Sequence, residues 1–173
     1  MSLITNVGRV ANALRLYKQY QTMYVGLGNS TAEGDNPKLP TPEVPTQSTL
    51  PGLLGMKKVT TTSLARLADS TTPTTAKTVL FDNRKFELVA VADAPARDGF
   101  YLYVEAKFEP TDFTSGTYRS VGLFTNPVFK DGVTGAVVPA GEITNQGTLE
   151  MYENRQAMSL GTATITQQFM IKG

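Results

Sequence analysis

The feature that most constrains the fold is a strict alternation of apolar and polar side chains over residues 100–109. One face carries Phe100, Leu102, Val104, Ala106 and Phe108, and the other carries Tyr101, Tyr103, Glu105, Lys107 and Glu109. Alternation of this length predicts a β-strand that packs one face on a core and leaves the other wet or half-covered. Residues that break strands, Asp98-Gly99 and Pro110, lie at its two ends.

Shorter segments of the same kind surround this strand. Further strands are predicted at about residues 56–67, 77–81, 85–91, 117–124, 149–155 and 163–172, and residues 128–139 form a loop or irregular hairpin. Turn residues separate these segments, as at Asp82-Asn83 and Asn126-Pro127. Seven or eight short strands joined by turns predict a mainly β fold, an antiparallel β-sandwich.

One helix is predicted, over residues 3–20, with Ser2 as its N-cap. Its apolar stripe, at spacings of three and four residues, consists of Leu3, Ile4, Val7, Val10, Ala11, Leu14, Tyr17 and Tyr20. The stripe has two interpretations: it packs on its own domain, or it lies in a groove of a neighbouring subunit. In the second case the candidate interface residues are Leu3, Val7, Val10, Leu14 and Tyr17.

A short strand and a proline-rich stretch follow the helix. Residues 22–31 read as a strand that ends in glycines, and residues 32–51 contain five prolines. Closely spaced prolines favour an extended path and exclude helix. We therefore predict an N-terminal helix and strand over 1–31, an extended linker over 32–52 and a β-sandwich domain over 53–173. The arm is predicted to contact a neighbouring subunit, and removing residues 1–50 is expected to leave a folded domain.

Composition excludes several classes of function. The chain has no cysteine and no histidine, which removes disulfides, thiolate metal sites and the commonest general base. Its 16 basic and 15 acidic residues nearly cancel, so no strong field attracts nucleic acid. No stretch approaches the roughly 18 apolar residues of a membrane span, and no secretory signal is apparent. We expect synthesis in a cytoplasm and no binding to nucleic acid or membrane.

Carboxylates alone could still support a hydrolase. The candidates are Glu105, Glu109, Asp112, Glu150 and Glu153. Such a site needs two carboxyl groups across a cleft, one with a raised pKa. Glu105 and Glu109 instead share a strand face with Lys107, which is typical of solvated charges. No serine lies in a nucleophile motif and no loop has the spacing of a calcium site. We expect no enzymatic activity, no cofactor and no metal.

Three stretches together resemble a known family. Residues 24–31 (Tyr-Val-Gly-Leu-Gly-Asn-Ser-Thr), followed by Asp35-Asn36-Pro37, resemble a segment near the N-terminus of tailed-phage virion proteins. Residues 118–127 (Tyr-Arg-Ser-Val-Gly-Leu-Phe-Thr-Asn-Pro) resemble their strand-to-loop motif. Residues 152–155 (Tyr-Glu-Asn-Arg), followed by Gln167-Gln168, resemble their C-terminus. The set is similar to the wedge protein of T-even-type baseplates and to related proteins of contractile tails.

The resemblance implies a non-enzymatic structural protein of a phage particle. Because the chain is much shorter than the T-even wedge protein, we expect first a neck or collar protein at the head-to-tail junction and second a baseplate wedge component. A β module that binds carbohydrate or a host receptor is the alternative of another class. The expected partners are copies of the chain in a ring and other virion proteins. Candidate interface or structural positions in the three stretches are Tyr24, Gly26, Gly28, Arg119, Asn126, Glu153, Asn154 and Arg155.

The charged cluster at residues 153–155 has two interpretations. A charged triplet after an apolar strand end commonly ties loops together, with Arg155 donating to a carboxylate or a carbonyl. Alternatively, Arg155 recognises another subunit. The first interpretation is preferred.

Overall fold

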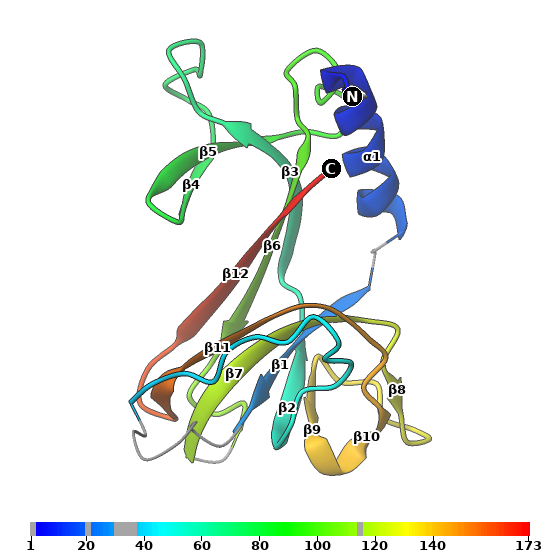
Figure 1. Ribbon diagram of the computed structural model, residues 1–173, viewed down its shortest axis with the longest axis vertical. Coiled ribbons are helices and arrows are strands. Elements are labelled where there is room, and N and C mark those ends of the chain that lie inside the picture. Colours follow the sequence, from blue (N-terminus) through cyan, green and yellow to red (C-terminus); the bar gives the residue numbers. More distant parts are fainter. Residues whose placement is uncertain (1–2, 20–21, 30–37, 114–115) are drawn as a thin grey trace. The chain divides into compact units, whose positions relative to one another are not determined.

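Figure 1 shows the computed structural model, which describes residues 3–19, 22–29, 38–113 and 116–173. Contacts between Cα atoms divide the chain into two compact units. The first comprises the described part of Met1–Gln21 with Thr60–Glu105 and Gln168–Gly173. The second comprises the described parts of Thr22–Val59 and Ala106–Gln167. These units follow contacts in space, whereas the predicted segments 1–31, 32–52 and 53–173 follow composition along the chain.

The second unit contains a five-stranded antiparallel sheet with the strand order β11-β7-β1-β2-β9. Its strands are β1 (Met23–Gly28), β2 (Leu53–Lys58), β7 (Gly116–Thr125), β9 (Val137–Pro139) and β11 (Thr148–Leu160). A two-stranded antiparallel sheet pairs β8 (Val128–Phe129) with β10 (Ile143–Asn145). The 3-10 helix η1 (Ala140–Glu142) connects β9 to β10.

The other five-stranded sheet has the order β12-β6-β3-β5-β4. Its strands are β3 (Thr61–Leu67), β4 (Thr78–Phe81), β5 (Arg84–Val89), β6 (Tyr101–Phe108) and β12 (Ile165–Lys172). The helix α1 (Asn6–Gln19) packs against β3 in the first unit. The mainly β fold of antiparallel sheets with an N-terminal helix that the sequence predicts is confirmed. The described residues form twelve strands rather than seven or eight, because several strands are only two to four residues long.

The strand that organises the sequence prediction is β6. Its predicted core residues Leu102, Val104 and Ala106 are fully buried. Tyr103, on the other face, is also buried, and its hydroxyl donates to Glu105 Oε2 at 2.6 Å and accepts from Gln168 Nε2 at 2.8 Å. Burial, followed by the bond to Glu105, raises the pKa of Tyr103. The second face is therefore closed by a tyrosine whose polar end is fully bonded.

The helix α1 begins at a threonine cap. Thr5 Oγ1 accepts a hydrogen bond from Gly8 N at 3.2 Å and Thr5 O accepts one from Arg9 N at 3.0 Å, which is the geometry of an N-cap. The predicted cap Ser2 and the stripe residue Tyr20 lie outside the described residues. Val10 and Ala13 are buried within the first unit. Part of the stripe therefore packs on its own unit, as the first interpretation requires.

One predicted strand is wrong. Residues 56–67 form two strands, β2 and β3, that belong to different sheets. The change occurs at Val59 and Thr60, whose amides donate to Met23 O at 2.9 Å and Glu105 O at 2.8 Å respectively. The β-branched run from Val59 to Thr62 favours extended backbone throughout. Propensity therefore could not locate the break, which is set by the change of partner strand.

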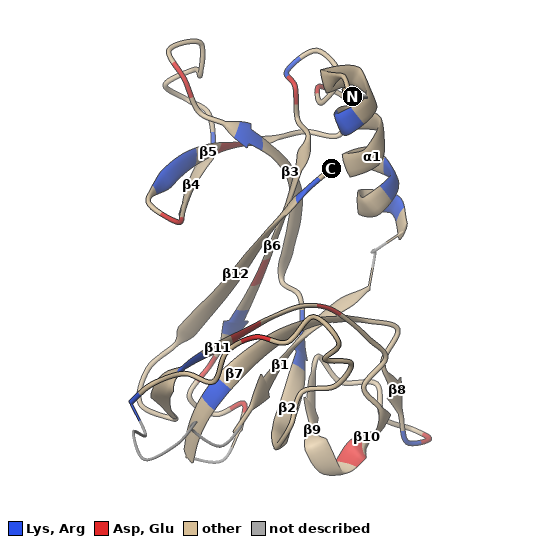
Figure 2. Ribbon diagram, viewed as in Figure 1, with Lys and Arg blue, Asp and Glu red and all other residues tan. Residues whose placement is uncertain are grey.

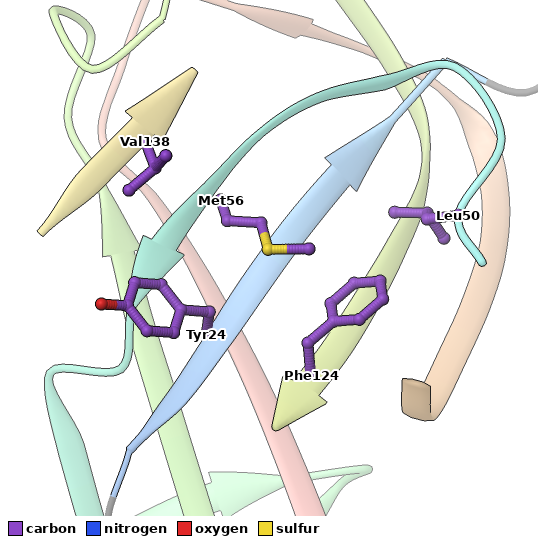
Figure 3. Packing of buried hydrophobic residues seen from close by; sticks show 5 residues of the cluster. All are labelled: Tyr24, Leu50, Met56, Phe124 and Val138. Atoms are coloured by element: carbon purple, nitrogen blue, oxygen red, sulfur yellow. The ribbon is translucent and has the colours of Figure 1, made fainter. Parts of the chain in front are cut away.

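The position of residues 23–28 also differs from the prediction, which placed them in the segment 22–31. The sequence assigns this segment to the N-terminal arm, but β1 is the middle strand of its sheet and all six of its residues are buried. Figure 3 shows the core cluster on one side of this sheet, formed by Tyr24, Leu50, Met56, Phe124 and Val138. The cluster joins residues from both halves of the sequence, so β1 is an integral part of the core.

The hairpin of β4 and β5 matches its sequence prediction. Asp82 and Asn83 connect the two strands and have φ angles of 48° and 57°. Two successive residues with positive φ form the two-residue turn that suits the twist of antiparallel strands. Aspartate and asparagine tolerate this backbone region better than other residues with a side chain.

A buried ion cluster lies in the first unit. Glu87, which is 3% exposed, accepts from Arg66 Nε at 2.9 Å and pairs with Arg97 at 2.7 Å. Arg66 also donates to Asp69 at 2.7 Å. Figure 2 shows that other charges are spread over strands and loops, while the charged residues of α1 are all basic. No helix in the described residues is long and apolar enough to cross a membrane.

Candidate interaction site

The central parts of the three stretches that carry the resemblance, residues 24–28, 118–125 and 152–155, lie on three adjacent strands. They correspond to β1, β7 and β11, which are neighbours in the sheet of the second unit. Gly122 of β7 lies opposite both Gly26 of β1 and Tyr152 of β11, and Ser120 lies opposite both Gly28 and Asn154. Residues about one hundred positions apart in sequence are therefore cross-strand partners on one surface.

The glycines of β1 have a packing role. A Cβ atom at Gly26 would lie 2.9 Å from Phe124 Cε2, and one at Gly122 would lie 2.8 Å from the same atom. The two facing glycines thus leave room for the ring of Phe124. A Cβ at Gly28 would lie 2.5 Å from Ser120 Oγ and 2.8 Å from Pro51 O. These contacts require glycine at each position without any phosphate ligand.

The predicted cluster at residues 153–155 is built on an irregular edge strand. The register of β11 against β7 shifts between Asn154 and Met158, as at a β-bulge. Arg155 Nη2 donates to Glu153 Oε2 at 2.6 Å, and Arg155 Nη1 donates to Gln167 Oε1 at 2.7 Å. These two bonds are local, as in the preferred interpretation, but they link Arg155 to Glu153 of the same strand and to Gln167 of β12 rather than tying loops together. Recognition of another subunit by Arg155 stays a prediction.

The sequence analysis missed the polar network that continues from Arg155. Gln167, 2% exposed, donates through Nε2 to the hydroxyl of Tyr118 at 3.0 Å, and that hydroxyl lies 3.3 Å from Met158 Sδ. Burial is the main cause that raises the pKa of Tyr118. Arg155 Nε is buried without a hydrogen-bond partner among the described residues. A signal was present, because Gln167 is the polar member of an otherwise apolar strand face.

The proline-rich stretch is held on β11 by side chains. We call residues 38–50 the strap. Asn154 Nδ2 donates to Thr41 O at 2.8 Å, and the Tyr152 hydroxyl donates to Val44 O at 3.0 Å and accepts from Val44 N. Asn154 N donates to Glu43 Oε1 at 3.0 Å. The motif residues Tyr152 and Asn154 thus fix the strap on its own unit.

The C-terminal end of the strap enters the core. Leu50 is 1% exposed, its amide donates to Gln146 Oε1 at 2.7 Å and its carbonyl accepts from Gln146 Nε2 at 3.3 Å. A side-chain amide that satisfies both backbone groups of one residue replaces a strand pairing at this point. The part of the predicted arm at residues 30–37 lies outside the described residues.

The remaining candidate interface positions do not form one site with the cluster at residues 153–155. Asn126 is exposed with a φ angle of 52° and ends β7 before Pro127, so it acts as a turn residue. Arg119 is half-buried in β7. On α1, Leu14 and Tyr17 are half-buried. The structure does not bring these α1 positions into the same unit as the three motif strands.

The start of the helix stripe remains accessible. Leu3 is 87% exposed, Ile4 64% and Val7 81%, whereas Val10 and Ala13 are buried. Val7 is in the first turn of α1, and Leu3 and Ile4 precede its Thr5 cap, so the three exposed apolar side chains lie close together in sequence at the start of the helix. Their contact with another subunit stays a prediction.

The carboxylates considered for catalysis have structural partners. Asp112 pairs with Lys57 and also accepts from Glu109 N at 2.7 Å. Glu109 accepts from Thr164 Oγ1 and Glu150 from Thr125 Oγ1, each at 2.7 Å. Within the described ranges, no group of three or more His, Cys, Asp or Glu residues could hold a metal ion.

Comparison with known proteins assigns the family. The model of the family described as Baseplate wedge 3 tail fiber network component matches residues 1–172. Virion protein 3 of Enterococcus phage phiEF24C is 30% identical over 171 residues, which cover 99% of this chain and 94% of that protein. The chain therefore belongs to the family of baseplate wedge 3 tail fiber network components and is a structural protein of a phage particle.

Proposed function

We propose that the protein is a non-enzymatic component of a phage baseplate wedge that connects to the tail fibre network through subunit contacts. The observation that carries this proposal is the family match over residues 1–172. It supports the baseplate alternative rather than the neck or collar position that the sequence resemblance placed first. The receptor-binding β module receives no support from this match.

The surface of the chain suits a role in assembly. The apolar surface at Leu3, Ile4 and Val7 is of the kind that a partner covers. Charged residues nearly balance, so association would depend on shape and apolar contact more than on long-range attraction. We propose other virion proteins as the partners. We also propose that copies of the chain form a homo-oligomeric ring, since head-to-tail contacts can close into rings.

The absence of catalysis is also part of the proposal. A surface hollow of about 410 Å³ in the second unit is lined by residues without a titratable side chain, namely Thr49, Leu53, Ala140, Ile143, Thr144, Asn145 and Gln146. General acid–base chemistry needs a titratable group within reach of the substrate, and this hollow supplies none. A second hollow, of about 340 Å³, contains Asp69 and Lys85, and Asp69 is already bonded to Arg66 and Thr71. Turnover of a glycan, peptide or nucleotide that is lost when one carboxylate is neutralised would contradict this part of the proposal.

The position is tested by electron microscopy of particles that carry a labelled copy. A small tag at exposed Gly132, whose surroundings are open, is expected to leave the fold intact. Additional density is expected at the baseplate, at the end of the tail away from the head. Density at the neck would refute the baseplate position, and untagged particles give the control reconstruction.

A second experiment tests the proposed contact surface at the start of α1 separately from the location of the chain in the particle. Leu3→Ser and Val7→Ser together remove the two most exposed side chains of the apolar surface at Leu3, Ile4 and Val7 without touching the buried Val10. Reduced incorporation into particles, with unchanged stability of the purified chain, is expected. Ala11→Ser, an exposed substitution on the same helix, is the matched control. Full incorporation of the double variant would show that this surface has no partner.

A further inference from the structure

The strap presents its apolar side chains to solvent. Leu39 is 55% exposed and Val44 48% exposed, and Pro40, Pro42 and Pro45 are exposed as well. An ordered segment that covers a core would be expected to turn such side chains inward. In the strap only the far end, Leu50, is buried.

Its backbone is extended for local chemical reasons. Proline fixes its own φ near −65°, and it drives the preceding residue into extended backbone, which applies here to Leu39, Thr41 and Val44. Residues 40–44 therefore favour a polyproline-type path. Gln47 N donates to Val44 O at 2.9 Å and closes a turn at Pro45, which ends this path.

The clamps on β11 hold this backbone without covering its outer surface. Tyr152 and Asn154 contact the backbone of Val44 and Thr41. They leave the side chains of Leu39, Val44 and Pro42 exposed. Ordering an extended segment in advance removes part of the entropy cost of binding a partner.

We propose that the strap is a docking ligand that another virion protein binds in a groove lined by aromatic side chains. Pro42-Glu43-Val44-Pro45 has the Pro-x-x-Pro spacing of extended segments that lie in such grooves. The aliphatic Leu39 and Val44 add apolar contacts beside the prolines. This inference rests on the proposed place of the chain in the particle and names the chemistry of one partner.

The groove belongs to a protein other than this one. Every aromatic residue that the structure describes is buried or half-buried, and none is in the exposed class. Two aromatic residues that adjoin the strap, Tyr152 and Tyr24, are already used, one as a clamp and the other in the core cluster with Leu50. Because none of these rings is in the exposed class, we assign the groove to a protein other than a second copy of the chain.

Photo-cross-linking in assembled particles tests the proposal. A benzophenone amino acid replaces Val44, and the control carries it at Val128, which is 53% exposed in the same unit. The Val44 position is expected to cross-link to a different virion protein, at a peptide that contains Phe, Tyr or Trp. The Val128 position is expected not to label that peptide. Cross-links confined to this chain or to a second copy, or none, would overturn the proposal.

Hydrogen exchange on unmodified protein keeps the test valid if the substituted chain fails to assemble. The strap amides of Leu39, Thr41 and Glu43 are expected to exchange at least about fivefold more slowly in particles than in the free chain, the factor that corresponds to about 1 kcal/mol. Equal exchange would overturn the proposal. The baseplate position is tested independently, because the tag reports the location of the chain whether or not the strap is covered.

Discussion

Replacing the buried amide of Gln167 by an apolar side chain tests how the β11 network stabilises the second unit. Gln167→Leu leaves the Nη1 group of Arg155 without its acceptor and removes the donor to the Tyr118 hydroxyl. The first bond involves a charged donor and is worth about 1.5–3 kcal/mol, and the second about 1 kcal/mol. Added apolar burial returns about 1 kcal/mol. We therefore expect a loss of about 2 kcal/mol in the free energy of unfolding.

A double-mutant cycle distinguishes this network from general damage to the core. Arg155 already has a buried Nε without a partner, so Arg155→Met removes a poorly satisfied group together with the charge. Once Arg155 is replaced, Gln167→Leu is expected to cost less than half as much, because no guanidinium Nη1 group is left without its acceptor. Urea unfolding followed by circular dichroism gives the four free energies. Independent sites have additive effects to within about 0.5 kcal/mol. If the double variant loses the sum of the two single-variant losses to within that margin, the coupling between Arg155 and Gln167 is refuted.

Three further predictions concern the cores and the acid response. Gly122→Ala is expected to cost about 1–3 kcal/mol in urea unfolding, because the new methyl group meets the ring of Phe124; an unchanged midpoint would show that the ring moves freely. Glu87→Gln is expected to cost about 2–3 kcal/mol in the same assay, since two guanidinium groups lose a buried anionic partner; a loss below about 0.5 kcal/mol would contradict the role of the ion cluster. Hydrogen bonds from Thr71, and then the charge of Arg66, lower the pKa of Asp69 below its ordinary value of 3.8. Its contribution to stability is therefore present above that value and is lost as the pH falls through the lowered pKa. Asp69→Asn should flatten the stability profile of acid titration in this range, and an identical profile would exclude Asp69 as a contributor.

The sequence predicted those elements whose signal is local. The alternation in β6 and the Asp82-Asn83 turn each depend on neighbouring residues, and the structure has both. The break between β2 and β3 depends on partner strands elsewhere in the chain. Because Val59 and Thr60 favour extended backbone in either sheet, the residues around the break carry no mark of it.

In the candidate site, too, the features with a local sequence signal were predicted and those that depend on distant partners were missed. The cluster at residues 153–155 was found because charges follow an apolar segment, but its acceptor Gln167 is on another strand. The role of β1 was missed for a similar reason, since glycines in a short strand resemble a flexible arm until their partner Phe124 is known. Removing residues 1–50, which the sequence suggested would spare the domain, is instead expected to unfold the second unit, because Val25 and Leu27 are fully buried there.

The pairing of Gly26 with Gly122 affects how the chain folds during synthesis. The ribosome makes residues 29–115 between β1 and β7, which takes roughly 4–17 s at the usual rate of translation. In that interval β1 can pair with β2 on one side only, as it does at Tyr24 and Lys58. Its other edge stays open beside apolar residues, which is a state prone to aggregation. The nascent chain is thus most vulnerable before β7 emerges, and chaperone supply or slower expression would govern the yield of soluble protein.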